Sequence, residues 1–178
     1  MYTIANTTFI NIPKDKRDEF LAEAAKNLQN RAEDMEFYRD FGIDHKDMDI
    51  EDFLDQIKEH GVDTFSRLED IAQKAEALPE FNEYGLCFDF VEAGTFDGQR
   101  CGYYRYQIST GGPGEEIRFY DGGLIEFVFL DWFTGVGFNV TYDERFNWLD
   151  KFFAEIEMMD WQSLDPEQIE LVDEDDTY

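Results

Sequence analysis

Carboxylates are the only side chains of this sequence that are numerous and clustered enough to suggest a chemistry. Of the 178 residues, 42 are acidic and 15 are basic, so the formal net charge at neutral pH is -27. Many of the acidic residues gather between positions 44 and 59. On a helix, side chains three or four positions apart are neighbours, and like charges at that spacing repel one another slightly. Such a surface is suited to contact with a cationic partner.

The net charge is larger than solubility requires, which suggests that it serves a function. A soluble domain needs a net charge of only about 2–8 to stay dispersed, and a larger charge opposes folding. Duplex DNA carries one negative charge per about 1.7 Å of axis, so a charge of -27 corresponds to about 46 Å of duplex. We therefore favour display of a nucleic-acid-like surface to a basic protein. Adaptation to high salt is an alternative, but the 18 phenylalanines argue against it.

The predicted contact surface draws on two helical segments, one in each half of the chain. Both carry carboxylates at helical spacing with few basic residues among them. The predicted partner-binding residues are Asp44, Asp47, Asp49, Glu51, Asp52, Asp55, Glu59, Asp143, Glu144, Asp150, Glu155 and Glu157.

The rest of the composition excludes several classes of protein. A pI of about 4.1 is incompatible with direct nucleic-acid binding, which requires Lys and Arg to neutralise phosphates. No apolar run is long enough to span a membrane, and the first residues do not resemble a secretory signal, so we expect a cytoplasmic protein. Cys87 and Cys101 are too few for a disulfide scaffold, and we expect both to be buried. Because His45 and His60 have no closely spaced partner ligand, we expect neither a metal nor a cofactor.

No motif predicts catalysis. The glycines of Gly111–Gly114 lack the spacing of a phosphate-binding loop and precede two glutamates, so they predict a hairpin turn. Arg105 and Arg118 lie on neighbouring predicted strands, where we expect ion pairs with Glu116 or Glu126. We therefore predict no catalytic residues. An enzyme that uses carboxylates without a recognisable motif is the less favoured alternative.

An α+β fold must position these residues. The first half, residues 1–80, has apolar side chains at three- and four-residue spacing and is mainly helical, with the segment 2–12 either a strand or a lead-in. Its helices are expected to begin after Pro13 and end at Gly42, to run from about Asp49 to Gly61, and to follow Asp63 up to Pro79.

The second half changes to short aromatic and β-branched runs separated by glycine-rich turns. This pattern predicts an antiparallel meander of four to five strands, at 84–92, 101–109, 115–120, 124–131 and 136–141. A final helix after Tyr142 is expected to pack on the sheet through Phe146, Leu149, Phe152, Phe153 and Ile156. We expect a single domain over 1–178, with an acidic tail at its end.

Part of the predicted sheet resembles a block found in small acidic proteins of plasmids and phages. The block is the stretch Tyr103–Phe119 (YYRYQISTGGPGEEIRF) followed by Phe129–Phe133 (FLDWF). This resemblance covers about 30 residues and brings no assigned chemistry, so it transfers no functional residue.

In size and charge, the chain is also similar to the DNA-mimic inhibitors that mobile elements use against host defences, namely anti-restriction and anti-CRISPR proteins. That likeness implies a non-catalytic inhibitor in a bacterial host cell. Its acidic surface would occupy the basic nucleic-acid channel of a nuclease or CRISPR surveillance complex. The alternative is an interaction or immunity module that binds a basic protein without imitating nucleic acid.

Overall fold

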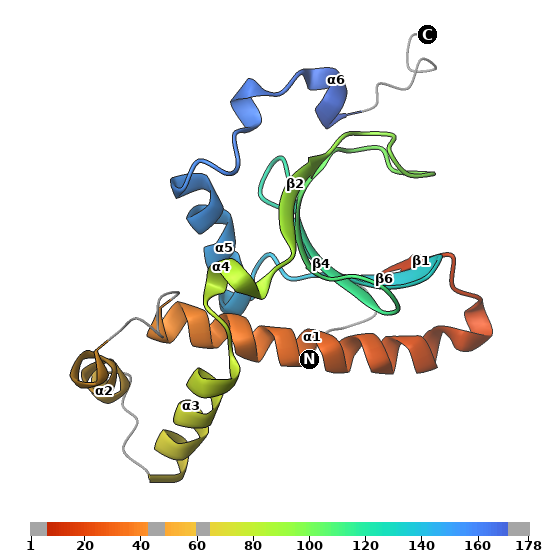
Figure 1. Ribbon diagram of the computed structural model, residues 1–178. Helices are drawn as coiled ribbons and strands as arrows, with labels where there is room; N and C mark the ends of the chain where they lie inside the picture. Colours follow the sequence, from red (N-terminus) through yellow and green to blue (C-terminus); the bar gives the residue numbers. More distant parts are fainter. Residues whose placement is uncertain (1–6, 43–48, 60–64, 171–178) are drawn as a thin grey trace, which may run out of the picture.

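A computed structural model of the protein describes residues 7–42, 49–59 and 65–170, and its centre is a six-stranded antiparallel sheet (Figure 1). The strand order is β1-β6-β5-β4-β3-β2, so β2 to β6 form a meander and β1 joins it beside β6. The strands are β1 (Thr7–Ile10), β2 (Cys87–Val91), β3 (Tyr103–Ser109), β4 (Gly114–Tyr120), β5 (Ile125–Asp131) and β6 (Thr134–Asn139). The predicted α+β class is confirmed, and β1 adds a sixth strand to the expected meander.

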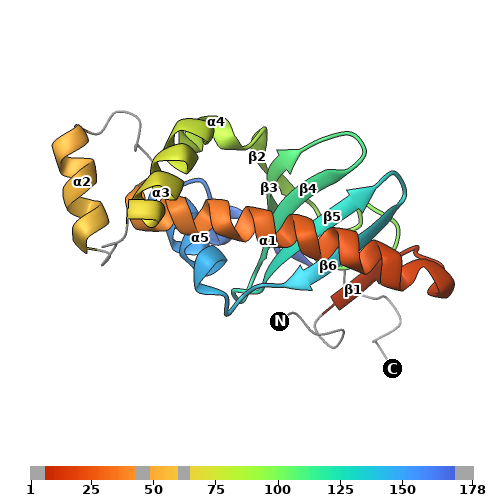
Figure 2. The same cartoon turned by 90° about the horizontal axis from the view of Figure 1, so that it is seen from below.

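Helix α1 (Arg17–Phe41) runs across the strands on one face of the sheet, as Figure 2 shows. Its buried side chains, among them Leu28 and Met35, recur at three- and four-residue spacing, so one side of the helix faces the core. The helix ends where Gly42 adopts a φ of 90°, a conformation that side chains with a β-carbon disfavour. The predicted end at Gly42 is confirmed.

Helix α5 (Glu144–Glu155) covers the same face of the sheet beside α1. Phe146, Leu149 and Phe153 are buried, and the ring of Phe153 stacks on Phe88 at a centroid distance of 4.2 Å. The prediction that Ile156 also packs on the sheet is wrong, because α5 ends before this residue and leaves it 46% exposed. In Figure 1 the sheet is bent, and α1 and α5 lie on the outer side of the bend.

The other helices connect these layers. They are the 3-10 helix η2 (Lys14–Lys16), α2 (Ile50–Glu59), α3 (Phe65–Ala77), α4 (Phe81–Tyr84), the 3-10 helix η3 (Trp161–Ser163) and α6 (Pro166–Ile169). The sequence did not predict α4, which occupies the place where a strand was expected to begin at residue 84. The predicted boundaries of the second and third helices at Gly61 and Asp63 lie outside the described residues.

Burial along the sheet follows its topology. In the central strand β5, Phe127 and Phe129 on the core side and Val128 on the opposite side are at most 1% exposed, whereas Glu126 and Leu130, also on the opposite side, are half-buried. The prediction of two buried cysteines is wrong. Cys87 begins the edge strand β2 and Cys101 precedes β3 in a bridge to Glu170, so both thiols are exposed.

Candidate functional site

One side of α2 forms a surface that we call the α2 acidic face, which consists of Asp52, Asp55 and Glu59. These three residues are exposed, and their spacing places them on one side of the helix. The opposite side is anchored, because Ile57 is buried and the ring of Phe53 lies 5.9 Å from that of Phe41 in α1. In both views α2 lies beyond the C-terminal end of α1, away from the sheet (Figures 1 and 2).

The other predicted residues of this segment are described only in part. Asp49 is exposed and immediately precedes α2. The backbone of Glu51 belongs to α2, but its side chain lies outside the described part of the chain, as do Asp44 and Asp47. The described portion of the predicted surface in this half is therefore Asp49 together with the α2 acidic face.

The predicted residues at the start of α5 have a structural role as well. Asp143 caps the helix by accepting a hydrogen bond of 3.0 Å from the backbone N–H of Arg145, and it pairs with the guanidinium of the same residue at 2.7 Å. Such a cap satisfies a donor that the helix itself leaves unpaired. Glu144, the next residue, is exposed in the first turn, where the positive end of the helix dipole favours a carboxylate.

The remaining predicted residues lie in the second half of α5 and just after it. Burial raises the pKa of Asp150 above its ordinary value. Glu155 forms an exposed ion pair with Lys151 at 3.5 Å, and Glu157 is exposed beyond the end of the helix. The predicted contact residues thus form two groups, one at α2 and one at α5, and both helices contact α1.

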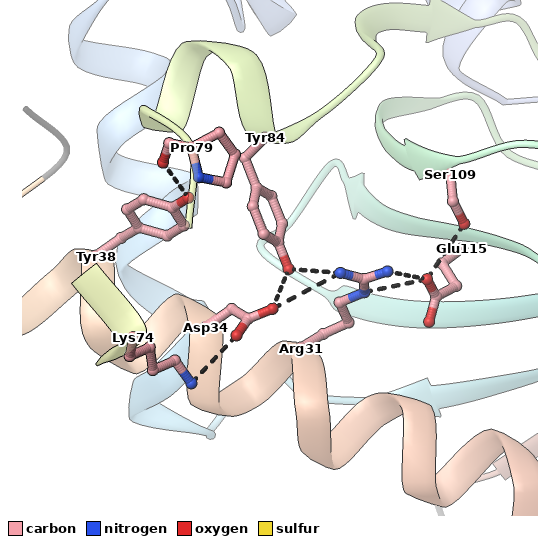
Figure 3. A network of polar contacts seen from close by, with 8 residues as sticks. All are labelled: Arg31, Asp34, Tyr38, Lys74, Pro79, Tyr84, Ser109 and Glu115. Atoms are coloured by element: carbon pink, nitrogen blue, oxygen red, sulfur yellow. Dashed lines mark hydrogen bonds and ion pairs between the residues drawn. The ribbon is translucent and has the colours of Figure 1, made fainter. Parts of the chain in front are cut away.

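A buried polar network connects α1 to α3, α4 and the sheet (Figure 3). From α1, the guanidinium of Arg31 donates hydrogen bonds to Glu115 of β4 (Nε–Oε2, 3.0 Å) and to the hydroxyl of Tyr84 in α4 (3.0 Å). Tyr84 donates in turn to Asp34 at 2.6 Å, and Lys74 of α3 lies 3.1 Å from the other oxygen of Asp34. The network fixes the helical half of the chain to the sheet.

Burial, hydrogen bonds and neighbouring charges together set the protonation states of Arg31 and Tyr84 in this network. Glu115 is 4% exposed, and its Oε1 atom has no hydrogen-bond partner among the described residues. Burial lowers the pKa of Arg31, but the hydrogen bond and charge of Glu115 together with Tyr84 outweigh this effect and raise the pKa above its ordinary value. Burial and the charge of Asp34 raise the pKa of Tyr84. At neutral pH Arg31 is therefore charged and Tyr84 keeps its proton as a hydrogen-bond donor.

A second charged network lies on the opposite face of the sheet, on the inner side of its bend. The strand register places one residue from each of five strands directly opposite the next, in the row Asp89, Arg105, Arg118, Glu126 and Asn139. Two arginines are thus direct cross-strand neighbours. Like charges in this position destabilise a sheet unless other groups offset their repulsion.

Carboxylates on either side of the two arginines supply that offset. Arg105 makes two hydrogen bonds to Asp89, of 2.9 and 2.6 Å, and Arg118 binds Glu116 at 2.6 Å. Glu116 is only 3% exposed and also lies 4.0 Å from Arg105. The predicted pairing of Arg118 with Glu116 is confirmed. The main partner of Arg105 is Asp89, whereas Glu126 accepts a hydrogen bond from a tyrosine of β4.

The side chain of Tyr103 lies on the same inner face of the sheet, next to Arg118. The guanidinium of Arg118 lies 4.6 Å from the centroid of the Tyr103 ring, a cation–π geometry. The hydroxyl of Tyr103 is buried and has no hydrogen-bond partner among the described residues, and burial raises the pKa of Tyr103 to about 12. Arg118 is thus held by an ion pair and an aromatic ring, whereas the buried hydroxyl of Tyr103 is left without a hydrogen-bond partner in the described part of the chain.

Comparison with other proteins adds no assignment. Within the described ranges, no group of three or more His, Cys, Asp or Glu side chains has the geometry to hold a metal ion. Among the helices that the structure describes, none is long and apolar enough to cross a membrane. No family model, curated protein or solved structure matches this chain.

Sequence reasoning missed the Arg31–Glu115 pair, although part of the signal was present. Side chains of a strand point alternately to its two faces, so Glu115 lies on the same face of β4 as Ile117 and Phe119. Because both of these apolar residues are buried, the alternation places the carboxylate toward the core. Arg31 lies three residues after the buried Leu28 of α1. What the sequence lacks is the position of α1 over the sheet, which brings these two side chains together.

Proposed function

We propose that this chain is an inhibitor produced by a mobile genetic element that blocks a basic DNA- or RNA-binding channel by charge mimicry. Its target would be a host nuclease or CRISPR surveillance complex in the bacterial cytoplasm, and the chain would act without catalysis. The observation that supports this proposal is how the charges are distributed. Arginines are paired with carboxylates inside the fold, whereas carboxylates on the helices remain exposed.

Four arginines, of the 15 basic residues in the chain, form such internal ion pairs. The pairs are Arg31–Glu115, Arg105–Asp89, Arg118–Glu116 and Arg145–Asp143. Their arginine side chains are 15% to 27% exposed, so these cations contribute little to the outer surface. The outer surface that a partner meets keeps its exposed carboxylates, beside which Lys14, Lys16 and Lys26 are the exposed cations at and near α1.

The helical surface offers carboxylates over a suitable length. Asp18, Glu19, Glu23 and Glu33 are exposed along α1, a helix of 25 residues that spans about 37 Å. Helix α2, which carries the α2 acidic face, lies beyond the C-terminal end of α1 (Figure 1). This length is of the same order as the duplex segment that carries the net charge of the chain.

The proposed mechanism is competition. Carboxylates take the places of phosphates against Lys and Arg side chains of the target, so the inhibitor and the nucleic acid exclude each other. Salt screens these contacts and lessens the gain from counterion release, so binding should weaken as salt rises. The sheet serves as the scaffold that holds the helices.

The experiment measures inhibition of DNA binding by purified restriction nucleases and CRISPR surveillance complexes. The test variant is the triple substitution Asp52→Lys, Asp55→Lys and Glu59→Lys. The matched control is Asp97→Lys, Asp121→Lys and Glu167→Lys, which makes the same change in net charge at exposed positions outside α1 and α2. We expect a target whose inhibition is lost in the test variant, retained in the control, and at least about tenfold weaker at high salt.

Two results would contradict the proposal. Equal loss in the two triple variants would mean that net charge, and not the helical surface, causes inhibition. A target that binds this chain and DNA at the same time would exclude mimicry and favour the interaction module instead.

A further inference from the structure

A pocket opens where the start of β2, α4 and α5 come together (Figure 1). Its volume is about 280 Å³, and aromatic rings that include Phe81, Phe88 and Phe153 line it. This volume lies just below the usual range of small-molecule sites, about 300–1,000 Å³. It suits a single large apolar side chain better than a drug-sized ligand.

The mouth of this pocket is apolar as well. Leu86, Ile156 and Met158 line it and are 59%, 46% and 43% exposed. Single apolar residues on a surface are normal, but a group of them around one concave site is typical of an interaction site. Interface residues that carry most of the binding energy are enriched in large aromatic side chains and arginine, and they lie in well-packed pockets from which water is excluded.

The pocket lies at an edge of the sheet. β2 is the last strand in the sheet order, and Cys87 and Phe88, which begin it, belong to the pocket lining together with the preceding Leu86. A strand in this position can pair with an extended segment of another chain, whose alternate side chains then point to the same face. One of those side chains would reach the pocket beside Phe88.

Acidic residues stand next to the pocket in the sequence. Glu83 follows the lining residue Asn82, and Glu157 lies between the lining residues Ile156 and Met158. Both carboxylate residues are exposed. Exposed carboxylates therefore alternate along the chain with residues that line the pocket, which favours a basic segment over an acidic one.

We propose that this pocket and the adjoining edge of β2 bind an extended basic segment of the partner protein, with one large apolar side chain inserted into the space that residues of α4, α5 and the start of β2 line. The inference rests on the proposed function for the existence of a basic partner, and it adds the contact that would give the complex specificity. A second copy of this chain is a poorer occupant, because two molecules of net charge -27 repel each other.

The test uses the full chain and two fluorescein-labelled peptides, KTKTFTKTK and the same peptide with serine in the central position. Fluorescence anisotropy gives the dissociation constants, and we expect the phenylalanine peptide to bind about tenfold more tightly or better, because only it fills the pocket. The double variant Leu86→Ser, Met158→Ser should remove this preference. Phe133→Ser is the matched control, since Phe133 is 85% exposed and lies at the turn between β5 and β6.

Cys87 provides a second readout at the site itself. In a Cys101→Ser background, its exposed thiol can be alkylated with N-ethylmaleimide and followed by intact mass. The bound phenylalanine peptide should slow this reaction at least about fivefold, because Cys87 lines the pocket. The serine peptide at the same concentration should protect it less.

The outcomes separate the two proposals. If both peptides bind equally and only salt or the α2 substitutions weaken them, the pocket proposal is wrong while charge mimicry stands. If neither peptide binds, or if the double variant keeps the preference, the pocket proposal is also wrong. If Leu86→Ser, Met158→Ser abolishes dimers seen by size-exclusion chromatography, a second copy occupies the site, and the inference is overturned. If the chain does not compete with DNA for a target but still prefers the phenylalanine peptide over the serine peptide, the proposed function is overturned instead.

Discussion

Replacement of Arg31 by methionine tests whether the buried network of Figure 3 holds the helices on the sheet. Methionine keeps most of the length of the side chain but removes the donors that reach Glu115 and Tyr84. Glu115, at 4% exposure, would then keep only the hydroxyl of Ser109 as a hydrogen-bond donor in this network, at 3.2 Å. Its carboxylate would be buried without a cation.

The expected cost follows from that geometry. Removing one partner of a buried ion pair lowers the free energy of unfolding by about 3–5 kcal/mol, and Arg31 belongs at the lower end because its side chain is 27% exposed. Glu115→Gln alone should cost about 1–2 kcal/mol, since the amide can still accept from Arg31. In the double variant no buried charge is left unpaired. Its loss should therefore be smaller than the sum of the two by about 1.5–3 kcal/mol.

The measurement is urea denaturation of the four proteins of this cycle, followed by tryptophan fluorescence. Lys151→Met is the matched control, because it breaks an ion pair whose side chains are 80% and 65% exposed, and it should change stability by less than about 0.5 kcal/mol. If Arg31→Met stays within about 1 kcal/mol of the wild type, the carboxylate does not depend on the guanidinium, and our account of the network is wrong.

Four further results are expected. Tyr103→Phe should leave the free energy of unfolding unchanged or raise it by up to about 1–2 kcal/mol, because the hydroxyl is buried and has no partner among the described residues. By contrast, Tyr38→Phe should lower the free energy of unfolding by about 1 kcal/mol, since it loses a 2.7 Å hydrogen bond to a backbone carbonyl. Asp150→Asn should stabilise the protein by less than about 0.5 kcal/mol at neutral pH. Because the folded-state pKa of this acid is raised, protonation favours the fold, so the gain should vanish in urea titrations below about pH 3, where the acid is protonated in both states. Gly85→Ala should lower the unfolding free energy by about 1–3 kcal/mol, because a β-carbon would lie 2.2 Å from the ring of Tyr106; unchanged stability would show that the ring moves aside freely. Raising sodium chloride from about 50 to 500 mM should increase the urea midpoint of the wild type, because it screens repulsion among exposed carboxylates, and a fall would contradict the charge distribution described above.

The parts of the fold that the sequence predicted are those set by local patterns. The three- and four-residue spacing of Ala24, Leu28, Ala32 and Met35 predicted the buried side of α1, and all four are fully buried. The glycine-rich turns predicted the meander, since each turn joins strands that are also neighbours in space. The predictions that the structure confirms are therefore mainly those that depend on residues close together in the sequence.

The parts that could not be predicted depend on contacts between distant segments. Whether Cys87 is buried depends on β2 being the edge of the sheet, which no local pattern reveals. The pairing of Arg105 with Asp89 depends on the register between β2 and β3, where these residues are direct partners. The pocket likewise needs α4, β2 and α5 in their three-dimensional places, because its lining residues come from both ends of the second half of the chain.

The internal ion pairs affect both the packing of the fold and the distribution of charge on its surface. The buried carboxylates Glu115 and Glu116 can be accommodated only beside guanidinium groups, so arginines that might have compensated the surface lie inside. An internal pair leaves the net charge unchanged but withdraws most of its cation from the outer surface. The exposed carboxylates of α1 and α2 face solvent, with the exposed Lys26 among those of α1. Salt then acts in opposite directions on the two properties of the molecule, since it relieves repulsion within the fold and weakens attraction to a basic partner. An acidic surface that only maintained solubility would give the first effect without the second.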